Sequence, residues 1–260
     1  MPARNTIRLY TSDTYYHIYN RGVEKRIVFQ DVSDYKMFLY YLFVYLAPKD
    51  IVEKTYPDLK IALRNGNFFN KVTLHSYVLM PNHFHLLAHQ TEKEYLTKFM
   101  RRITNAYTTY FNSKYERVGS LFQGVFKCAN IETYEYLLQL SKYIHLNPIP
   151  ILHPSQKIED YLWSSYRIYL KLQKTSYIHS SLILNFFSIG LAPLKRSILF
   201  LYRYRNTYTN TICPKIYFLS YNINTIIQIV FISNIIQRSI VSMRRFAYSC
   251  LQNLQFITLT

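Results

Sequence analysis

The fold is decided by residues 71–89, which have the sequence KVTLHSYVLMPNHFHLLAH. Two runs rich in β-branched, aromatic and aliphatic residues, 71–79 and 83–89, flank the turn-forming sequence MPN. We therefore predict two strands joined by a tight turn. In the second strand His83 and His85 are two positions apart, so their imidazoles project from the same face.

Outward from this pair, the spacing of apolar residues predicts further elements. They are a strand over 15–20, a helix over 31–46, a helix from a Thr91 capping box to residue 112, a short strand within 119–128, a helix over 133–147 and a short helix over 160–172. Residues 47–70 are predicted to be loop. This order of elements predicts an α+β domain of ferredoxin-like type, an antiparallel sheet with helices on one face.

The composition is strongly basic. The 260 residues include 31 Lys and Arg against 14 Asp and Glu, a formal charge of +17. This balance indicates a polyanionic partner, nucleic acid before membrane. A hydrophobic content of 50% excludes a fully disordered chain. The three cysteines have no CxxC spacing, which argues against a disulfide framework or a cysteine zinc site and fits a reducing cytoplasm.

The C-terminal part of the chain has an unusual composition. All 14 acidic residues lie in the first 160 positions, whereas the last 100 contain 11 Lys and Arg and no Asp or Glu. Residues whose codons begin with G (Asp, Glu, Gly, Ala and Val) number four in 191–260. A basic tail that binds nucleic acid and a tail translated out of frame beyond about residue 190 are both open interpretations. We predict a domain over 1–175 and a separate tail over 176–260.

Two pairs of side chains could carry chemistry. His83 and His85 form a co-facial pair that can hold a metal ion. Tyr143 and Asn147 are four residues apart in a predicted helix and share one face. A phenol beside a metal-binding amide can serve phosphoryl transfer, because the tyrosine attacks phosphorus while a cation stabilises the developing charge.

Basic residues are interleaved with aromatic residues in the first part of the chain. Cations neutralise phosphates and aromatic rings stack on unpaired bases, so the pattern favours nucleic-acid binding. The candidate DNA-binding residues are Arg21, Arg101, Arg102, Arg117 and Lys127. Two further histidines near the HxH pair, His75 and His89, are interpreted as strand surface residues.

Five sequence blocks occur in one order along the chain. They are YHIYNRG (16–22), SYVLMPNHFHLL (76–87), GSLFQGVFK (119–127), YIHLNP (143–148) and WSSY (163–166). Over residues 15–169 these blocks resemble the IS200-like transposase family. Within that family the chain is most similar to the REP-associated tyrosine transposases, which are single-tyrosine HUH nucleases. The last 85 to 90 residues show no such resemblance.

The resemblance implies a site and a reaction. His83 and His85 would be the HUH pair that binds Mg²⁺ or Mn²⁺, and Tyr143 would be the catalytic tyrosine. Asn147 matches the position of the third ligand, where relatives often have Gln. The protein would cut and rejoin single-stranded DNA near hairpins through a 5′-phosphotyrosine intermediate, in DNA transposition. The resemblance also implies a homodimer; we expect it in the cytoplasm, at the nucleoid when bound to DNA.

Three alternatives are considered beside this interpretation. The first is a non-catalytic hairpin-binding protein from a decayed mobile element. The second is a metallohydrolase built on the HxH pair, which would need further His or Asp ligands and lacks an HExxH motif. The third is a membrane protein, but the best apolar segment, residues 225–236, is too short to span a bilayer, and no membrane association is expected.

Overall fold

The computed structural model describes residues 10–59 and 66–188 of the chain. Its strands are β1 (Thr14–Arg21), β2 (Val72–Met80), β3 (His83–Gln90) and β4 (Lys127–Ile131). Its α-helices are α1 (Val32–Leu46), α2 (Lys49–Thr55), α4 (Tyr95–Lys114), α5 (Tyr134–Leu146), α6 (Tyr166–Tyr169) and α7 (Ser181–Ser188). Short 3₁₀ turns cover Val23–Lys25, Ile149–Ile151 and Ile158–Asp160.

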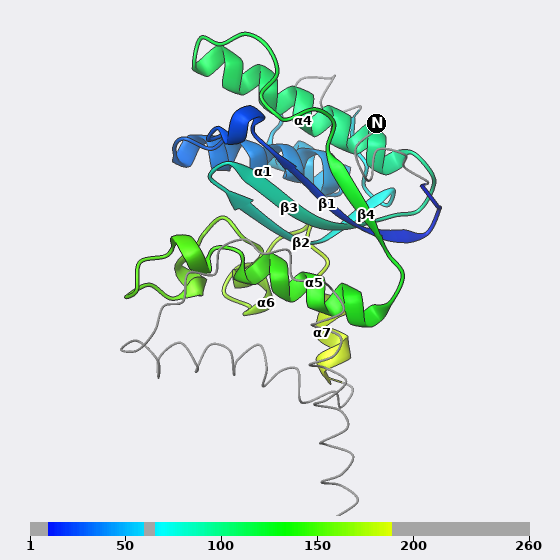
Figure 1. The fold of residues 1–260 in the computed structure, drawn as a ribbon. Helices are drawn as coiled ribbons and strands as arrows, with labels where there is room; N and C mark the ends of the chain where they lie inside the picture. Colours follow the sequence, from blue (N-terminus) through cyan, green and yellow to red (C-terminus); the bar gives the residue numbers. More distant parts are fainter. Residues whose placement is uncertain (1–9, 60–65, 189–260) are drawn as a thin grey trace, which may run out of the picture. The chain divides into compact units, whose positions relative to one another are not determined.

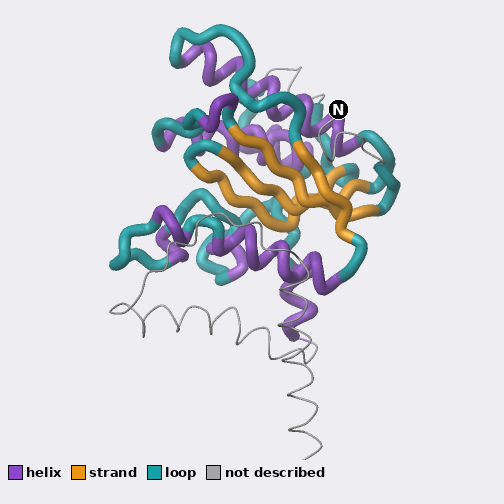
Figure 2. Tube along the Cα trace, viewed as in Figure 1, coloured by secondary structure: helices purple, strands orange, loops and turns teal. Residues whose placement is uncertain are grey.

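The four strands form one sheet in the order β2-β3-β1-β4, and each neighbouring pair is antiparallel (Figures 1 and 2). Together with the chain order β1, α1, β2, β3, α4, β4, this arrangement is ferredoxin-like. The fold class predicted from the sequence is therefore confirmed. The β2–β3 hairpin turns at the predicted MPN sequence, and a β-bulge between Leu74 and Ser76 shifts the register of β2.

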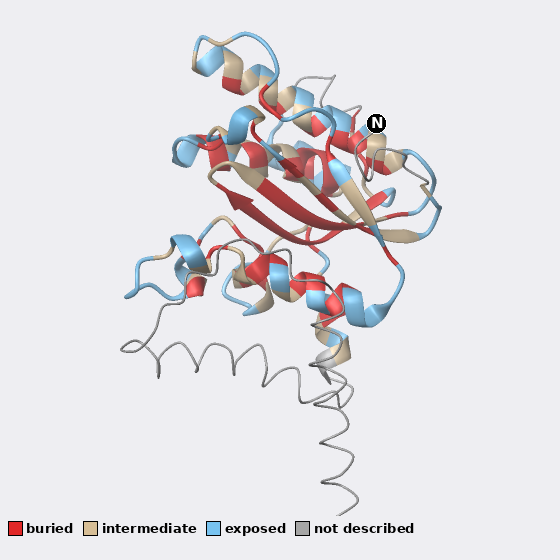
Figure 3. Ribbon diagram, viewed as in Figure 1, coloured by how far each residue is buried: buried red, intermediate tan, exposed pale blue. Residues whose placement is uncertain are grey.

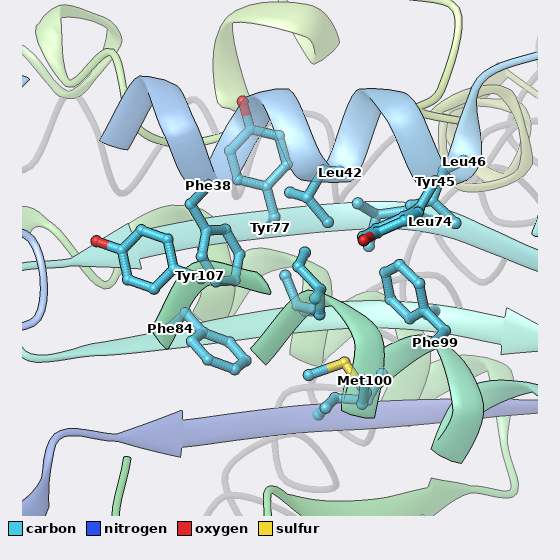
Figure 4. Packing of buried hydrophobic residues seen from close by; sticks show 14 of the residues in the cluster. Phe38, Leu42, Tyr45, Leu46, Leu74, Tyr77, Phe84, Phe99, Met100 and Tyr107 are labelled. Atoms are coloured by element: carbon cyan, nitrogen blue, oxygen red, sulfur yellow. The ribbon is translucent and has the colours of Figure 1, made fainter. Parts of the chain in front are cut away.

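One face of the sheet packs against α1 and α4 through an aromatic core (Figure 4). Ile18 of β1 and Phe84 and Leu86 of β3 project into this layer and are fully buried. Phe38 of α1 meets Phe84 with ring centroids 5.3 Å apart, and Tyr107 of α4 packs edge-on against Phe38 at 5.1 Å. Burial of such large apolar rings is a main source of the stability of the domain.

The opposite face is covered by α5, which lies below the sheet in Figure 1, and holds a second core. Val78 and Leu87 of the sheet pack in this core with Leu137 and Ile144 of α5. Figure 3 shows buried residues along both the sheet and α5. The prediction of helices on one face is correct for α1 and α4 and wrong for α5, which packs on the other face. As a result β2 is buried on both sides, as its apolar sequence requires.

Buried polar side chains fix α5 against β2. His145 Nε2 of α5 lies 2.8 Å from Ser165 Oγ, and Ser165 Oγ accepts a hydrogen bond from the Tyr77 backbone N–H at 2.9 Å. Ser141 Oγ of the same helix lies 3.1 Å from Ser76 Oγ of β2. Ser165 belongs to the WSSY block, so this block ties the sheet to the helix that carries the candidate nucleophile.

Local differences from the predicted elements have identifiable causes. The Thr91 capping box is wrong, because the Thr91 backbone N–H donates to the Lys71 carbonyl at 3.1 Å and the helix begins at Tyr95. Its N-cap residue, Glu94, has a left-handed backbone (φ 71°) and no side-chain cap. The predicted loop over 47–70 contains the short helix α2. The predicted N-terminus of α5 is confirmed, with Thr133 accepting from the backbone as N-cap.

The packed domain extends past the predicted boundary at residue 175. Ile178 forms a bridge with Leu74, and the His179 backbone N–H donates to the Leu74 carbonyl at 2.9 Å. Ile183 of α7 is buried in the second core. The two interpretations of the tail beyond residue 190 concern positions outside the described residues. Within the part that the structure describes, no helix combines the length and apolar character needed to cross a membrane.

Candidate active site

β3 brings both predicted histidines to the face that α5 covers. The ring centroids of His83 and His85 are 5.1 Å apart and their planes make an angle of 87°. His83 is half-buried and His85 is buried. His83 Nδ1 lies 2.7 Å from Asn82 Oδ1, and Asn82 Nδ2 donates to the Lys25 carbonyl at 3.3 Å. Because the amide oxygen can only accept, His83 Nδ1 carries the proton and Nε2 keeps its lone pair.

α5 places Tyr143 and Asn147 beside this pair. The Tyr143 ring meets the His85 ring edge-on, with centroids 5.4 Å apart. The Asn147 side chain is close enough to both Tyr143 and His83 to shift their pKa values. Its backbone stays helical (φ −53°, ψ −36°) although a proline follows, which keeps its side chain one turn from Tyr143. Tyr143 is 49% exposed, so a DNA strand can reach it.

A third histidine, His17 of β1, completes the cluster and was not predicted from the sequence. Its Nε2 lies 2.9 Å from His85 Nδ1, and the two rings lie edge to edge with centroids 5.1 Å apart and an angle of 21° between their planes. The His17 ring also meets the Tyr143 ring edge-on at 6.2 Å. The signal in the sequence is the polar alternation of His17, Tyr19 and Arg21 in YHIYNRG, which places all three on one strand face.

Burial favours the neutral form of the three imidazoles. It lowers the pKa of His17 to about 4. It also holds the pKa of His85 well below its usual value, with a smaller effect of neighbouring His17 and His83. For His83, burial lowers the pKa and the hydrogen bond with Asn147 opposes this. Neutral imidazole is the form that binds a metal cation, so these side chains stay competent as ligands below their usual pKa.

The Tyr143 hydroxyl is a protonated phenol near neutral pH. Burial raises its pKa, the hydrogen bond with Asn147 lowers it, and nearby Tyr19 raises it again. The nucleophile must therefore lose its proton during attack. Lys142 precedes Tyr143 in α5, and burial lowers its pKa. Lys127 pairs with Tyr19 across β1 and β4.

The donor set fits a divalent cation. Two imidazole nitrogens and one amide oxygen, from His83, His85 and Asn147, could ligate such a cation, and the amide oxygen is the donor that suits a hard cation such as Mg²⁺ or Mn²⁺. The Nδ1 atoms of both histidines have partners in the protein, a common arrangement around metal ligands. Over residues 10–59 and 66–188, no group of three or more His, Cys, Asp or Glu side chains is arranged to hold a metal ion. The metallohydrolase alternative requires such a group.

A comparison with protein families agrees with the sequence blocks. Residues 49–147 match the family model described as Transposase IS200 like. The resemblance to the IS200-like transposases is confirmed over these residues. The matched segment contains His83, His85, Tyr143 and Asn147, whereas His17 precedes it.

Two solved structures also match this chain. One is a REP-associated tyrosine transposase bound to a REP hairpin, with 14% identity, coverage of 68% of this chain and 92% of that chain, and a TM-score of 0.44. The other is a putative transposase from Deinococcus radiodurans R1, with 18% identity, coverage of 54% and 95%, and a TM-score of 0.31. A search of curated proteins found no match.

Two of the five candidate DNA-binding cations share a sheet face with Tyr143. Arg21 pairs with His83 across β1 and β3, and Lys127 pairs with Tyr19 across β1 and β4. Paired residues project to the same side of a sheet, so both cations lie on the face of the histidine cluster. Both are exposed.

The other three candidate cations lie elsewhere. Arg101 and Arg102 are exposed on α4, which covers the face opposite to α5 (Figure 1). Arg117 follows α4, donates from its guanidinium to Asn112 Oδ1 at 3.1 Å and lies over the Phe111 ring. The structure therefore does not gather the five cations into one patch, because charge in the sequence does not determine the face on which it lies.

Proposed function

We propose that this protein is a metal-dependent, transposase-type DNA nuclease and strand transferase that cuts and rejoins single-stranded DNA through Tyr143. The observation that carries the proposal is the convergence of Tyr143 and Asn147 from α5 with His83 and His85 from β3. All four lie in the segment that matches the IS200-like transposases. The net charge of +17 supports a nucleic-acid partner.

The reaction is a transesterification in two steps. The Tyr143 oxygen attacks the scissile phosphorus, a Tyr–O–P bond forms, and the bond from phosphorus to the 3′ oxygen breaks. The tyrosine loses its proton, and the released 3′ oxygen becomes a 3′-OH. A 3′-OH then attacks the 5′-phosphotyrosine and restores Tyr143, so no nucleotide cofactor is consumed.

His83, His85 and Asn147 are the residues that would hold Mg²⁺ or Mn²⁺. The bound cation would supply charge stabilisation at the scissile phosphate. Asn147 has a second role in the protein itself, because its hydrogen bond favours the ionised form of Tyr143 against the effect of burial. The same side chain thus orients the nucleophile and reaches His83.

The proposed substrate is single-stranded DNA with a hairpin next to the cut, by resemblance of the five sequence blocks. Arg21 and Lys127 would contact the strand that enters the site, since they share its face. Arg101, Arg102 and Arg117 would contact DNA beyond it. The proposed active form is a homodimer that acts in the cytoplasm, at the nucleoid when bound to DNA; light scattering of the protein at several concentrations tests the dimer.

The proposal is tested by covalent capture. The full chain is incubated with labelled hairpin oligonucleotides in Mn²⁺ or EDTA, and the products are separated under denaturing conditions. We expect a metal-dependent protein–DNA adduct that disappears in Tyr143→Phe while hairpin binding persists. Tyr136→Phe is the matched control, because Tyr136 is also exposed and lies two turns earlier on the same helix.

Each other outcome has a defined meaning. An adduct that persists in Tyr143→Phe would place the nucleophile elsewhere. Hairpin binding without an adduct, over a wide panel of hairpins, would favour the non-catalytic binding protein.

A further inference from the structure

Each of the two candidate metal-binding histidines has a hydrogen-bond partner at its Nδ1 atom. His83 uses Nδ1 to contact Asn82 Oδ1, and His85 uses Nδ1 to contact His17 Nε2 at 2.9 Å. The orientation of the Asn82 amide is set by the bond from its Nδ2 to the Lys25 carbonyl, so the tautomer of His83 is determined. For the bond between His17 and His85, two assignments of the proton are possible.

The two assignments have opposite consequences for metal binding. A nitrogen–nitrogen contact of 2.9 Å has room for one proton. If His85 Nδ1 carries it, Nε2 of His85 has a lone pair and can ligate a cation. If His17 Nε2 carries it, the neutral His85 ring has its own proton on Nε2 and cannot ligate through that atom.

We infer that His17 is a positioning residue that accepts a hydrogen bond from His85 Nδ1 and so keeps Nε2 of His85 available as a metal ligand. The inference rests on the proposed function, because it assigns a purpose to a residue next to the proposed cation site. His17 then accepts a hydrogen bond from Nδ1 of His85, as Asn82 does from Nδ1 of His83.

The placement of His17 supports a role in orienting the ring. The two imidazoles are nearly coplanar, with an angle of 21° between their planes, and the bond between their edges restricts rotation of the buried His85 ring. Tyr19 stacks on the His85 ring at 5.7 Å. His17 is anchored in the central part of β1, where it pairs with Leu87 of β3. A rigid strand therefore presents the acceptor to His85.

The first test is the tautomer in the full chain without metal. The protein is labelled with ¹⁵N-histidine, and two-bond nitrogen–proton correlation spectra distinguish protonated from unprotonated ring nitrogens. The His85 signals are identified by their loss in His85→Gln. We expect Nδ1 of His85 to be protonated and Nε2 to be unprotonated. A wild-type His85 protonated on Nε2 would overturn the inference.

The second test compares variants by spectra and by Mn²⁺ titration. His17→Phe keeps an aromatic ring at this position but removes the acceptor, and we expect loss of the Nδ1–H tautomer of His85 and about 10–100-fold weaker Mn²⁺ binding. His17→Gln keeps an acceptor oxygen and should recover most of both signals. His89→Gln is the control and should change neither signal, since His89 lies on β3 with His85 but bonds to Asp13.

The outcomes separate this inference from the proposed function. Wild-type Mn²⁺ affinity and an unchanged His85 tautomer in His17→Phe would overturn the role of His17 while adduct formation still stands. A tautomer that depends on His17, in a protein that forms no adduct with any hairpin, would overturn the proposed function and leave the role of His17 intact. If His17→Phe fails to fold, the wild-type spectrum and His17→Gln still decide.

Discussion

The two faces of the sheet are built from alternate residues of the same strands, yet they differ in chemistry. In β3, Phe84 and Leu86 enter the aromatic core under α1 and α4, while His85 lies between them on the opposite face. In β1, Ile18 and His17 divide in the same way. Because the side-chain period of a strand is two, a shift of one residue would exchange packing residues for reactive ones.

The comparison shows how a small domain holds a reactive cluster. The face with α1 and α4 is filled by interlocking aromatic rings, which makes the strands rigid. The same strands present imidazoles on the other face, where α5 adds a phenol and an amide. Side chains on rigid strands and helices are positioned more accurately than side chains on loops, which the proposed chemistry requires.

The largest expected effects come from two neighbouring residues, one of which mainly determines metal affinity and the other mainly stability. His85→Ala should reduce Mn²⁺ affinity by about 100-fold or more, since loss of a hydrogen-bond partner to a ligand alone costs about 10–100-fold. It should lower the free energy of unfolding by about 1–3 kcal/mol, less than a core truncation does, because it leaves the hydrogen bond of His17 unmade. Phe84→Ala should lower the free energy of unfolding by about 3–5 kcal/mol, because Phe84 is fully buried in the core.

Adduct formation per folded molecule should survive in Phe84→Ala. If the two substitutions changed stability and metal affinity to similar degrees, the claim that one face of the sheet supplies stability and the other the metal site would be wrong.

A second prediction concerns the loss of folding stability at low pH. His75 is buried on the side of α5 rather than on the strand surface, which corrects the interpretation from sequence, and burial lowers its pKa to about 4. The folded pKa lies below the unfolded value, so protons favour the unfolded chain and stability falls as the pH decreases from about 6.5 towards 4. This group alone should cost about 2–3 kcal/mol near pH 4.5.

Urea unfolding curves at several pH values measure this effect. The His75→Gln variant, which keeps a donor for the His179 carbonyl, should lose less stability on acidification than the wild type. Parallel pH curves for the two proteins would exclude His75 as a source of acid sensitivity.

The smallest predicted effect concerns the cations. Arg21→Ala should weaken binding of an unstructured single strand several-fold and reduce its salt dependence by about 0.7 in the log–log slope, as expected for one phosphate contact. Arg101→Ala, on the other side of the sheet, should not change binding of the same strand. Fluorescence anisotropy over a range of salt concentrations measures both, and the reverse ranking would place the DNA on the α4 face.

The elements that depend on local pattern were predictable from the sequence. The MPN turn, the strand alternation and the capping of α5 by Thr133 are each encoded within a few residues. The prediction that Tyr143 and Asn147 share one helix face also follows from helical spacing, and Asn147 is close enough to lower the pKa of Tyr143. The histidine pair on β3 follows from the period of a strand.

The remaining features depend on contacts between distant residues. His17 was missed because its role comes from the pairing of β1 with β3, and its partner His85 is 68 positions away. The Thr91 capping box failed because the backbone of Thr91 bonds to Lys71 across the sheet. Arg101 and Arg102 were grouped with Arg21 by charge, but only tertiary structure determines their face.

The most direct test of the central claim is mass spectrometry of the trypsin-digested protein–DNA adduct. Cleavage after Lys142 and Lys157 gives the peptide 143–157, in which Tyr143 is the only tyrosine. The account predicts that the nucleotide is attached to this peptide. Attachment to the preceding peptide, 128–142, which contains Tyr134 and Tyr136, would contradict it.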